Sequence, residues 1–201
     1  MVEEEQVVVK LLGGERVYLR PPEKKDTGLL FRSFYNPEVR RLTGTYQVIS
    51  MDAMESWLER VIQDDSRLLL LIVERESDRV VGDVELLEIH PVNRSAHIRI
   101  ALHDEKEFGK GYGTEAMGLM LDHGFGHLNL HRIELEVFDY NHRGIRTYEK
   151  LGFRREGVKR EALFNDGTYH DVIQMGLLAG EYRKRSEVGS GDEGAGMNSR
   201  V

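Results

Sequence analysis

Three glycines alternate with larger residues in the stretch FGKGYGTEA, which runs from Phe108 to Ala116. The stretch follows a predicted strand and opens a predicted helix, so free N–H groups and the positive end of the helix dipole converge there. Glycine lets a phosphate approach those groups closely, although glycines also serve simply to permit a tight turn. The stretch contains neither GxxxxGK[ST] nor GxGxxG. The stretch therefore predicts a phosphate loop outside the common NTP and NAD classes.

A second group of residues lies downstream, where Asn141, Tyr148 and Gly152-Phe153 flank or occupy a short predicted helix. Together with the glycine loop, this group resembles the GCN5-related N-acetyltransferases, whose coenzyme loop reads Q/R-x-x-G-x-G/A. Phe108 replaces the usual Gln or Arg, which is familiar in the branch similar to polyamine and ribosomal-protein N-terminal acetyltransferases. Further segments resemble that branch: VVGDVELLEIHPVNRSA (80–96, most like spermidine N-acetyltransferases), LNLHRIEL (128–135) and GTYHD (167–171).

The resemblance implies acetyl-CoA as co-substrate and no metal. It assigns the pyrophosphate to the backbone N–H groups of residues 108–114 and the pantetheine arm to the strand at 100–102, where two strands splay apart. A backbone N–H there would polarise the thioester carbonyl as an oxyanion hole does. Asn141 also suits a helix N-cap. The expected coenzyme-binding residues are Ile100, Ala101, Leu102, Phe108, Gly109, Lys110, Gly111, Tyr112, Gly113, Thr114, Asn141, Arg146 and Tyr148.

Acetyl transfer to an amine needs an acid for the leaving thiolate and a base or water relay for the amine. Tyr148 is the expected acid, because the family places a tyrosine near the sulfur at this helix position. A phenol with a pKa of about 10 can protonate a thiolate whose acid form has a pKa of about 8.5 only modestly uphill, and burial tunes this difference. The alternative for Tyr148 is a packing role on the sheet.

Candidates for the base and for acceptor binding lie on the predicted central strands. Glu85 and His97 are candidate catalytic residues, and Glu85, Glu88 and Tyr46 are candidate acceptor-binding residues. Strand alternation sends Glu85 and Glu88 to opposite faces unless a bulge intervenes. The resemblance matches both glutamates to polyamine enzymes, but His97 replaces their usual Glu, and the segment 42–46 lacks their paired acids.

The resemblance predicts an N-acetyltransferase that works by direct transfer in a ternary complex. A polyamine such as spermidine is the favoured acceptor, and the α-amine of a protein N-terminus or another small amine is the alternative. A different class of function is a non-catalytic acyl-CoA sensor that kept the loop and lost turnover. A homodimer or larger homo-oligomer is also plausible, since sheet edges are exposed in such folds.

The composition limits the other classes of function. The chain of 201 residues carries a net charge of −7, which gives no overall attraction to nucleic acid, and it contains no cysteine. No apolar run is long enough to span a membrane, and the acidic start MVEEEQ does not resemble a secretory signal, so a cytoplasmic location is expected. We expect an N-terminal extension (1–14), a single domain (15–185) and a disordered tail (186–201).

The elements that must position these residues follow from hydrophobic period and turn signals. The predicted order is strand, two helices, three antiparallel strands, helix, strand, helix and hairpin. This order predicts an α+β (mixed α/β) fold with a mainly antiparallel central sheet, and not the doubly wound nucleotide fold. The predicted strands are 17–20, 67–75, 79–90, 95–102, 133–138 and a hairpin around 165–167; the predicted helices are 24–35 (ended by Pro37), one capped by Ser50, 112–125 and 143–151.

Overall fold

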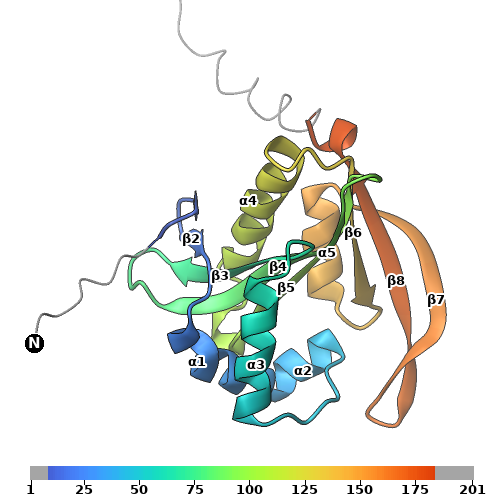
Figure 1. The fold of residues 1–201 in the computed structure, drawn as a ribbon. Coiled ribbons are helices and arrows are strands. Elements are labelled where there is room, and N and C mark those ends of the chain that lie inside the picture. Colours follow the sequence, from blue (N-terminus) through green and yellow to red (C-terminus); the bar gives the residue numbers. More distant parts are fainter. Residues whose placement is uncertain (1–8, 184–201) are drawn as a thin grey trace, which may run out of the picture.

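The computed structural model describes residues 9–183, which form one eight-stranded sheet in the order β1-β2-β3-β4-β5-β6-β8-β7 (Figure 1). Neighbouring strands are antiparallel except β5 and β6, which run parallel. The strands are β1 (Leu12–Gly13), β2 (Val17–Arg20), β3 (Leu68–Glu74), β4 (Val80–His90), β5 (Ser95–Leu102), β6 (Arg132–Phe138), β7 (Arg154–Asn165) and β8 (Thr168–Leu178). The predicted α+β class with a mainly antiparallel sheet is confirmed.

Helices cover both faces of this sheet. The α-helices are α1 (Thr27–Phe34), α2 (Pro37–Thr43), α3 (Met51–Ile62), α4 (Tyr112–Gly126) and α5 (His142–Leu151), with short 3-10 turns η1 (Lys24–Asp26) and η2 (Glu105–Glu107). β1 lies within the predicted N-terminal extension and pairs with β2. The predicted tail, 186–201, lies outside the described residues.

Strand β3 separates two hydrophobic clusters, because its side chains are buried on both faces. Leu70 and Ile72 belong to the larger cluster with α4, whereas Leu69 and Leu71 pack with α1 and α3 in the smaller one. This two-sided burial accounts for the continuous apolar run at 68–73. The sheet is thus the middle layer of three.

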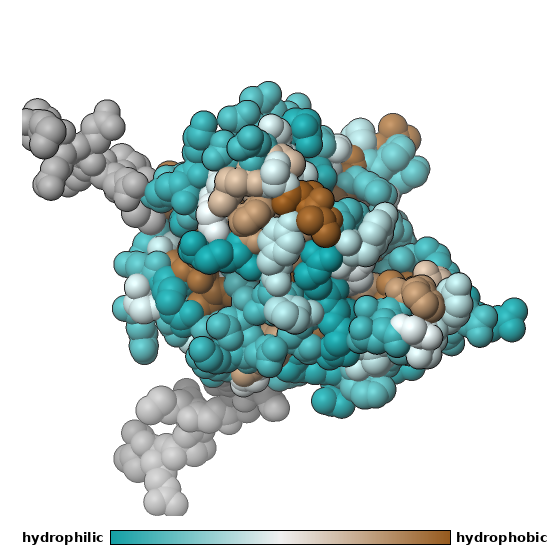
Figure 2. All heavy atoms as spheres, turned by 90° about the horizontal axis from the view of Figure 1, so that it is seen from below, coloured by the Kyte–Doolittle hydropathy of each residue, from teal (hydrophilic) through white to brown (hydrophobic). Residues whose placement is uncertain are grey.

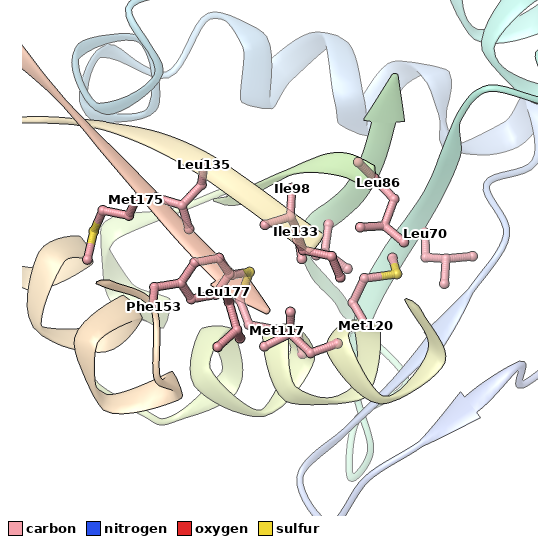
Figure 3. Packing of buried hydrophobic residues seen from close by; sticks show 14 of the residues in the cluster. Leu70, Leu86, Ile98, Met117, Met120, Ile133, Leu135, Phe153, Met175 and Leu177 are labelled. Atoms are coloured by element: carbon pink, nitrogen blue, oxygen red, sulfur yellow. The ribbon is translucent and has the colours of Figure 1, made fainter. Parts of the chain in front are cut away.

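The larger cluster anchors α4, the helix that begins at the glycine loop. Met117 and Met120 of α4 pack against sheet residues that include Leu86, Ile98 and Ile133 (Figure 3). Met120 and Ile133 are fully buried. Because large-to-small changes in such a core cost stability, the start of α4 is held firmly against the strands that form the site.

The prediction that Pro37 stops the first helix is confirmed, because α1 ends at Phe34. A further helix was missed, because Pro37 also begins α2. Asn36 caps this helix by accepting hydrogen bonds from the backbone N–H groups of Glu38 (2.9 Å) and Val39 (3.1 Å). Proline is favoured at the first helical position because its missing N–H is not needed there. The segment 42–46, expected as a loop between two helices, therefore starts inside α2 and leaves it through Gly44, whose φ is 67°.

The sheet opens in its middle, as expected. β5 and β6 share three register pairs, Ser95 with Arg132, Ala96 with Ile133 and His97 with Glu134, and the pairing stops there. Beyond His97, β5 continues to Leu102 and β6 to Phe138 without a ladder between them. The unpaired edges of both strands face a gap next to the start of α4.

The side of the molecule that carries α1, α2 and α3 is mostly hydrophilic, with separate hydrophobic areas (Figure 2). Exposed apolar side chains of the described residues include Tyr46 and Val48, between α2 and α3, and Phe164 and Tyr169 on the β7–β8 hairpin. The rings of Phe164 and Tyr169 lie 5.0 Å apart.

Candidate active site

A cavity of about 640 Å³ occupies the gap between β5 and β6. Its walls come from the ends of both strands, the glycine loop, and helices α2, α4 and α5. The lining residues on the coenzyme side that sequence analysis predicted are Ile100, Ala101, Leu102, Phe108, Gly109, Gly111, Gly113, Thr114, Asn141 and Tyr148. The structure thus brings together in one place two motifs that are far apart in the sequence.

The glycine loop presents a bare helix N-terminus to the cavity. Gly109 and Gly111 have φ values of 76° and 87°, a left-handed conformation that favours glycine. Gly111 is the N-cap of α4, and the N–H of Glu115 is the donor to its carbonyl. The N–H groups of residues 112–114 precede this first helical bond and lack intrahelical acceptors. They can bind an anion such as a pyrophosphate.

A hydrogen-bond network braces this loop from behind. The Tyr112 hydroxyl donates to Glu74, and hydrogen bonds from Ser77 and Tyr112 lower the pKa of Glu74 to about 2. Arg79 binds Glu107 at 2.7 Å, and Lys110 binds the other oxygen of Glu107 at 3.0 Å. Sequence analysis did not predict these contacts, because β3, β4 and the loop meet only in the folded chain.

Tyr148 faces the cavity from α5, a helix whose start Asn141 caps by accepting from the N–H of Gly144 at 2.9 Å. Burial raises the pKa of Tyr148 to about 12, because the phenolate would lose its hydration. Asn141 both caps the helix and lines the cavity. The phenol therefore stays protonated at neutral pH and can act as a donor.

Three predicted coenzyme residues lie less directly in the site. The described residues that line the cavity do not include Lys110, Tyr112 or Arg146. Arg146 is exposed on α5. Arg143 of the same helix lines the cavity instead, with its guanidinium 3.7 Å from the centre of the Phe108 ring. The aromatic residue at 108 thus supports a cation by a cation–π contact, a role that sequence analysis missed.

Glu85 lies beside the cavity and is fully buried between two guanidinium groups. Arg67 donates to one of its oxygens at 2.7 Å, and Arg99 donates to the other. Arg99 lines the cavity and also lies 3.5 Å from Asp83. Glu85 thus fixes a cavity-lining arginine, and its role as a base stays a prediction.

His97 lies at the rim, where its Nε2 is 2.9 Å from Glu134 and 3.6 Å from Glu88. Glu88 has a φ of 54° and sits in a register shift between Leu87 and His90. Such a bulge is the condition under which Glu88 can leave its expected face. The described residues that line the cavity do not include His97, Glu88, Glu85 or Tyr46. Thr45, next to Tyr46, does line it.

Glu136 and Arg99, which line the cavity across its gap, were missed by sequence analysis. The alternation in RIELEVF (132–138) contains the signal, because Ile133 and Leu135 are buried in the core and Glu136 must then face the other way. That Glu136 and Arg99 face the cavity was not predictable, since this depends on where the pairing between β5 and β6 stops.

A sheet that opens beside a bare helix N-terminus and a partly buried tyrosine defines the architecture of a coenzyme-dependent acyltransferase. The model of the acetyltransferase (GNAT) domain matches residues 16–154, and the chain belongs to this family. Among residues 9–183, no helix is long and apolar enough to cross a membrane, and no group of three or more His, Asp or Glu side chains is placed to hold a metal.

Named relatives make the similarity more specific. The chain is 36% identical over 138 residues to spermidine N(1)-acetyltransferase of Vibrio cholerae, which covers 69% of this chain and 79% of the relative. A crystal structure of spermidine N-acetyltransferase from V. cholerae with CoA and spermine matches with a TM-score of 0.79 and 29% identity, over 85% of this chain and 99% of that one. A dodecameric V. cholerae structure matches with a TM-score of 0.74 and 28% identity, over 86% and 99%.

Proposed function

We propose that this protein transfers the acetyl group of acetyl-CoA to a primary amine of a polyamine, by direct attack in a ternary complex. The observation that carries the proposal is the shared cavity, in which the bare start of α4 and the partly buried Tyr148 face one gap in the sheet. The similarity to a structure that holds both CoA and spermine supports the same pair of ligands here.

The coenzyme side fits an extended, anionic thioester. The N–H groups at residues 112–114 bind the pyrophosphate, and the unpaired edge of β5 at Ile100–Leu102 offers backbone groups to a pantetheine arm. The cationic Arg143 lies on the same wall. Acetyl-CoA, when bound there, supplies the activated acyl group.

Tyr148 is the proposed acid. Because its pKa is raised to about 12, it holds its proton until a strong base forms beside it. The departing thiolate is such a base, since the same dry surroundings raise the proton affinity of a thiolate. The phenol proton then passes to sulfur, and the proton that the attacking amine releases restores the phenol, so no negative charge stays on the leaving group or on Tyr148.

His97 and Glu85 are the proposed candidates for taking the proton of the amine, and their surroundings differ. Both oxygens of Glu85 are bound by arginines, so its lone pairs are committed to structure. The His97 side chain is 37% exposed, so solvent can reach its ring. We therefore favour His97 as the base acting through water, and Glu85 as the residue that positions Arg99.

The acceptor is proposed to be spermidine-like, and the enzyme to work as a homo-oligomer. A spermine complex and a dodecameric assembly are both described for the V. cholerae relative. The segment 42–46 carries no acidic residue in this chain. We propose that recognition of the cation rests instead on Glu88 of β4 and on the carboxylates of β6.

A thiol-release assay with a panel of amines tests the proposal. The protein is incubated with acetyl-CoA and either spermidine, a peptide with a free N-terminus or no amine, and free CoA is measured. We expect release with spermidine well above the other two. Release with the peptide alone would replace the polyamine by a protein N-terminus, and no release with any amine would favour a non-catalytic sensor.

A further inference from the structure

The strand geometry divides the side chains of β6 into two sets. Ile133, Leu135 and Val137 are buried in the large core on the α4 side of the sheet. Successive strand residues point to opposite faces, so Glu134 and Glu136 lie on the face toward α1–α3. Glu134 lies where the pairing with β5 ends, and Glu136 lies two residues further along, in the lining of the cavity.

The same division applies to β5 and fixes what lies opposite each glutamate. Ala96 and Ile98 are in the core, so His97 and Arg99 share the face of Glu134 and Glu136. His97 and Glu134 form the last register pair. Two residues further along, Arg99 and Glu136 line the cavity from its two sides.

Two carboxylates line the cavity within the described part of the chain, and they differ in their partners. Glu107, beside the glycine loop, is buried and is bound by both Arg79 and Lys110, whose charges lower its pKa. Glu136 is 40% exposed and pairs with Lys159 of β7, which is itself half exposed. Its other contact is the amide of Gln174, at 3.5 Å.

The charges around Glu136 leave it available to a ligand. Arg99, across the gap, is turned toward Glu85 and Asp83 on β4. The hydrogen bonds that Glu136 receives from Lys159 and Gln174 both fall on Oε1. An exposed lysine–glutamate pair is a weak interaction and exchanges readily for another cation.

We propose that Glu136 binds a positively charged nitrogen of the acceptor and that Lys159 competes with the acceptor for it. This inference rests on the proposed function and specifies which carboxylate of the cavity makes the enzyme selective for polycations. Lys159 then acts as a built-in counterion, which keeps Glu136 neutralised until an acceptor arrives.

The competition gives two substitutions opposite effects. We measure the Kd of spermidine by calorimetric titration into protein saturated with CoA, so that no turnover occurs. Glu136→Gln should weaken spermidine binding about 10-fold, because a charge-assisted contact is lost. Lys159→Gln should tighten it about 3-fold, because the carboxylate is released from an exposed ion pair. In the double variant the gain from Lys159→Gln should disappear.

A matched control separates this effect from a general change in charge. Glu149→Gln removes a carboxylate that is 45% exposed, is paired with Arg155 at 3.0 Å and is not among the residues that line the cavity. It should leave the spermidine Kd unchanged. The CoA Kd and the melting temperature should be unchanged in all four variants, which excludes misfolding as the cause.

The results that would overturn the inference differ from those that overturn the function. If the wild-type protein binds spermidine and Glu136→Gln binds it equally well, Glu136 is not the site and the proposed function stands. If Lys159→Gln still tightens binding when Glu136 is absent, the effect is general electrostatics and the competition is refuted. If the wild-type protein does not bind spermidine, the proposed acceptor fails and the inference fails with it.

Discussion

Two glutamates line the cavity, Glu107 on the coenzyme wall beside the glycine loop and Glu136 on the acceptor wall formed by β6. Each is paired with a lysine, but the two pairs should affect their ligands in opposite ways. On the coenzyme wall, Lys110 binds Glu107 at 3.0 Å; on the acceptor wall, Lys159 binds Glu136. An anionic coenzyme would use the lysine and be repelled by the glutamate. A cationic acceptor would use the glutamate and be repelled by the lysine.

The walls also differ in what does the binding. The coenzyme wall relies on backbone N–H groups of the glycine loop, which carry no net charge and cannot be neutralised by a neighbour. The acceptor wall relies on side chains, each already engaged with an opposite charge. A backbone site is therefore tied to the fold, whereas a side-chain site can change its specificity through single substitutions.

The largest effect on activity is expected from Tyr148, which lines the cavity between the two walls. Tyr148→Phe removes the phenol proton and keeps the ring, so kcat should fall by about 100-fold or more. The CoA and spermidine Kd values should stay unchanged, because neither wall is altered. Single-turnover release of thiol measures the step directly. Wild-type kcat in this variant would assign Tyr148 a packing role only.

A change in backbone conformation at Gly111 should weaken coenzyme binding, because Gly111 is the N-cap of α4. Alanine at Gly111 would adopt a φ of 87° and place its Cβ 2.3 Å from the guanidinium of Arg16. Left-handed backbone costs a non-glycine residue about 1–2 kcal/mol, so the CoA Kd should rise about 10-fold. Titration calorimetry with CoA measures this change.

Gly118→Ala is the matched control for that experiment, because Gly118 lies inside α4 with open space around its Cβ position. It should leave the CoA Kd unchanged and raise the melting temperature, since alanine favours helix. If both alanine variants weakened CoA binding equally, the left-handed backbone at 111 would not be the cause.

A smaller change tests the meaning of the pair on the coenzyme wall. Glu107→Gln removes a negative charge near the phosphate site and releases Lys110, so the CoA Kd should fall about 3-fold. Arg79 keeps Glu74 as a partner at 3.2 Å, which limits the loss of stability. Weaker CoA binding without a drop in melting temperature would show that Glu107 orders the loop more than it repels the coenzyme.

The smallest expected effect concerns pH. The pKa of Tyr148 is about 12 in the folded protein and about 10 in the unfolded chain, so the folded protein keeps this proton up to a higher pH. Its contribution to stability is complete below about pH 10 and is lost as the pH rises toward 12. Between about pH 7 and pH 9, ionisation of Tyr148 should change kcat less than twofold. An alkaline decline in that range that vanishes in Tyr148→Phe would contradict the raised pKa.

The coenzyme wall was predictable because its information is local. The spacing of the glycines places the helix start, and Asn141 and Tyr148 lie on one short helix, so their arrangement follows from helix geometry. Phe108 also indicated a departure from the common loop, but its contact with Arg143 needed the folded chain.

The acceptor wall was less predictable because its arrangement is decided by pairing between strands. Glu88 depends on a bulge, and Glu136 on the point where the β5–β6 ladder ends. Helix α2 was missed for a different reason, since a proline that cannot continue one helix is well suited to begin the next.

The independence of the two walls can be tested in one experiment. Calorimetric titrations of CoA, and of spermidine into CoA-saturated protein, are carried out on wild type, Gly111→Ala and Glu136→Gln. We predict that Gly111→Ala weakens CoA binding about 10-fold and leaves spermidine binding intact at saturating CoA, and that Glu136→Gln does the reverse. Equal weakening of both ligands in either variant would contradict the account of one cavity with two separate walls.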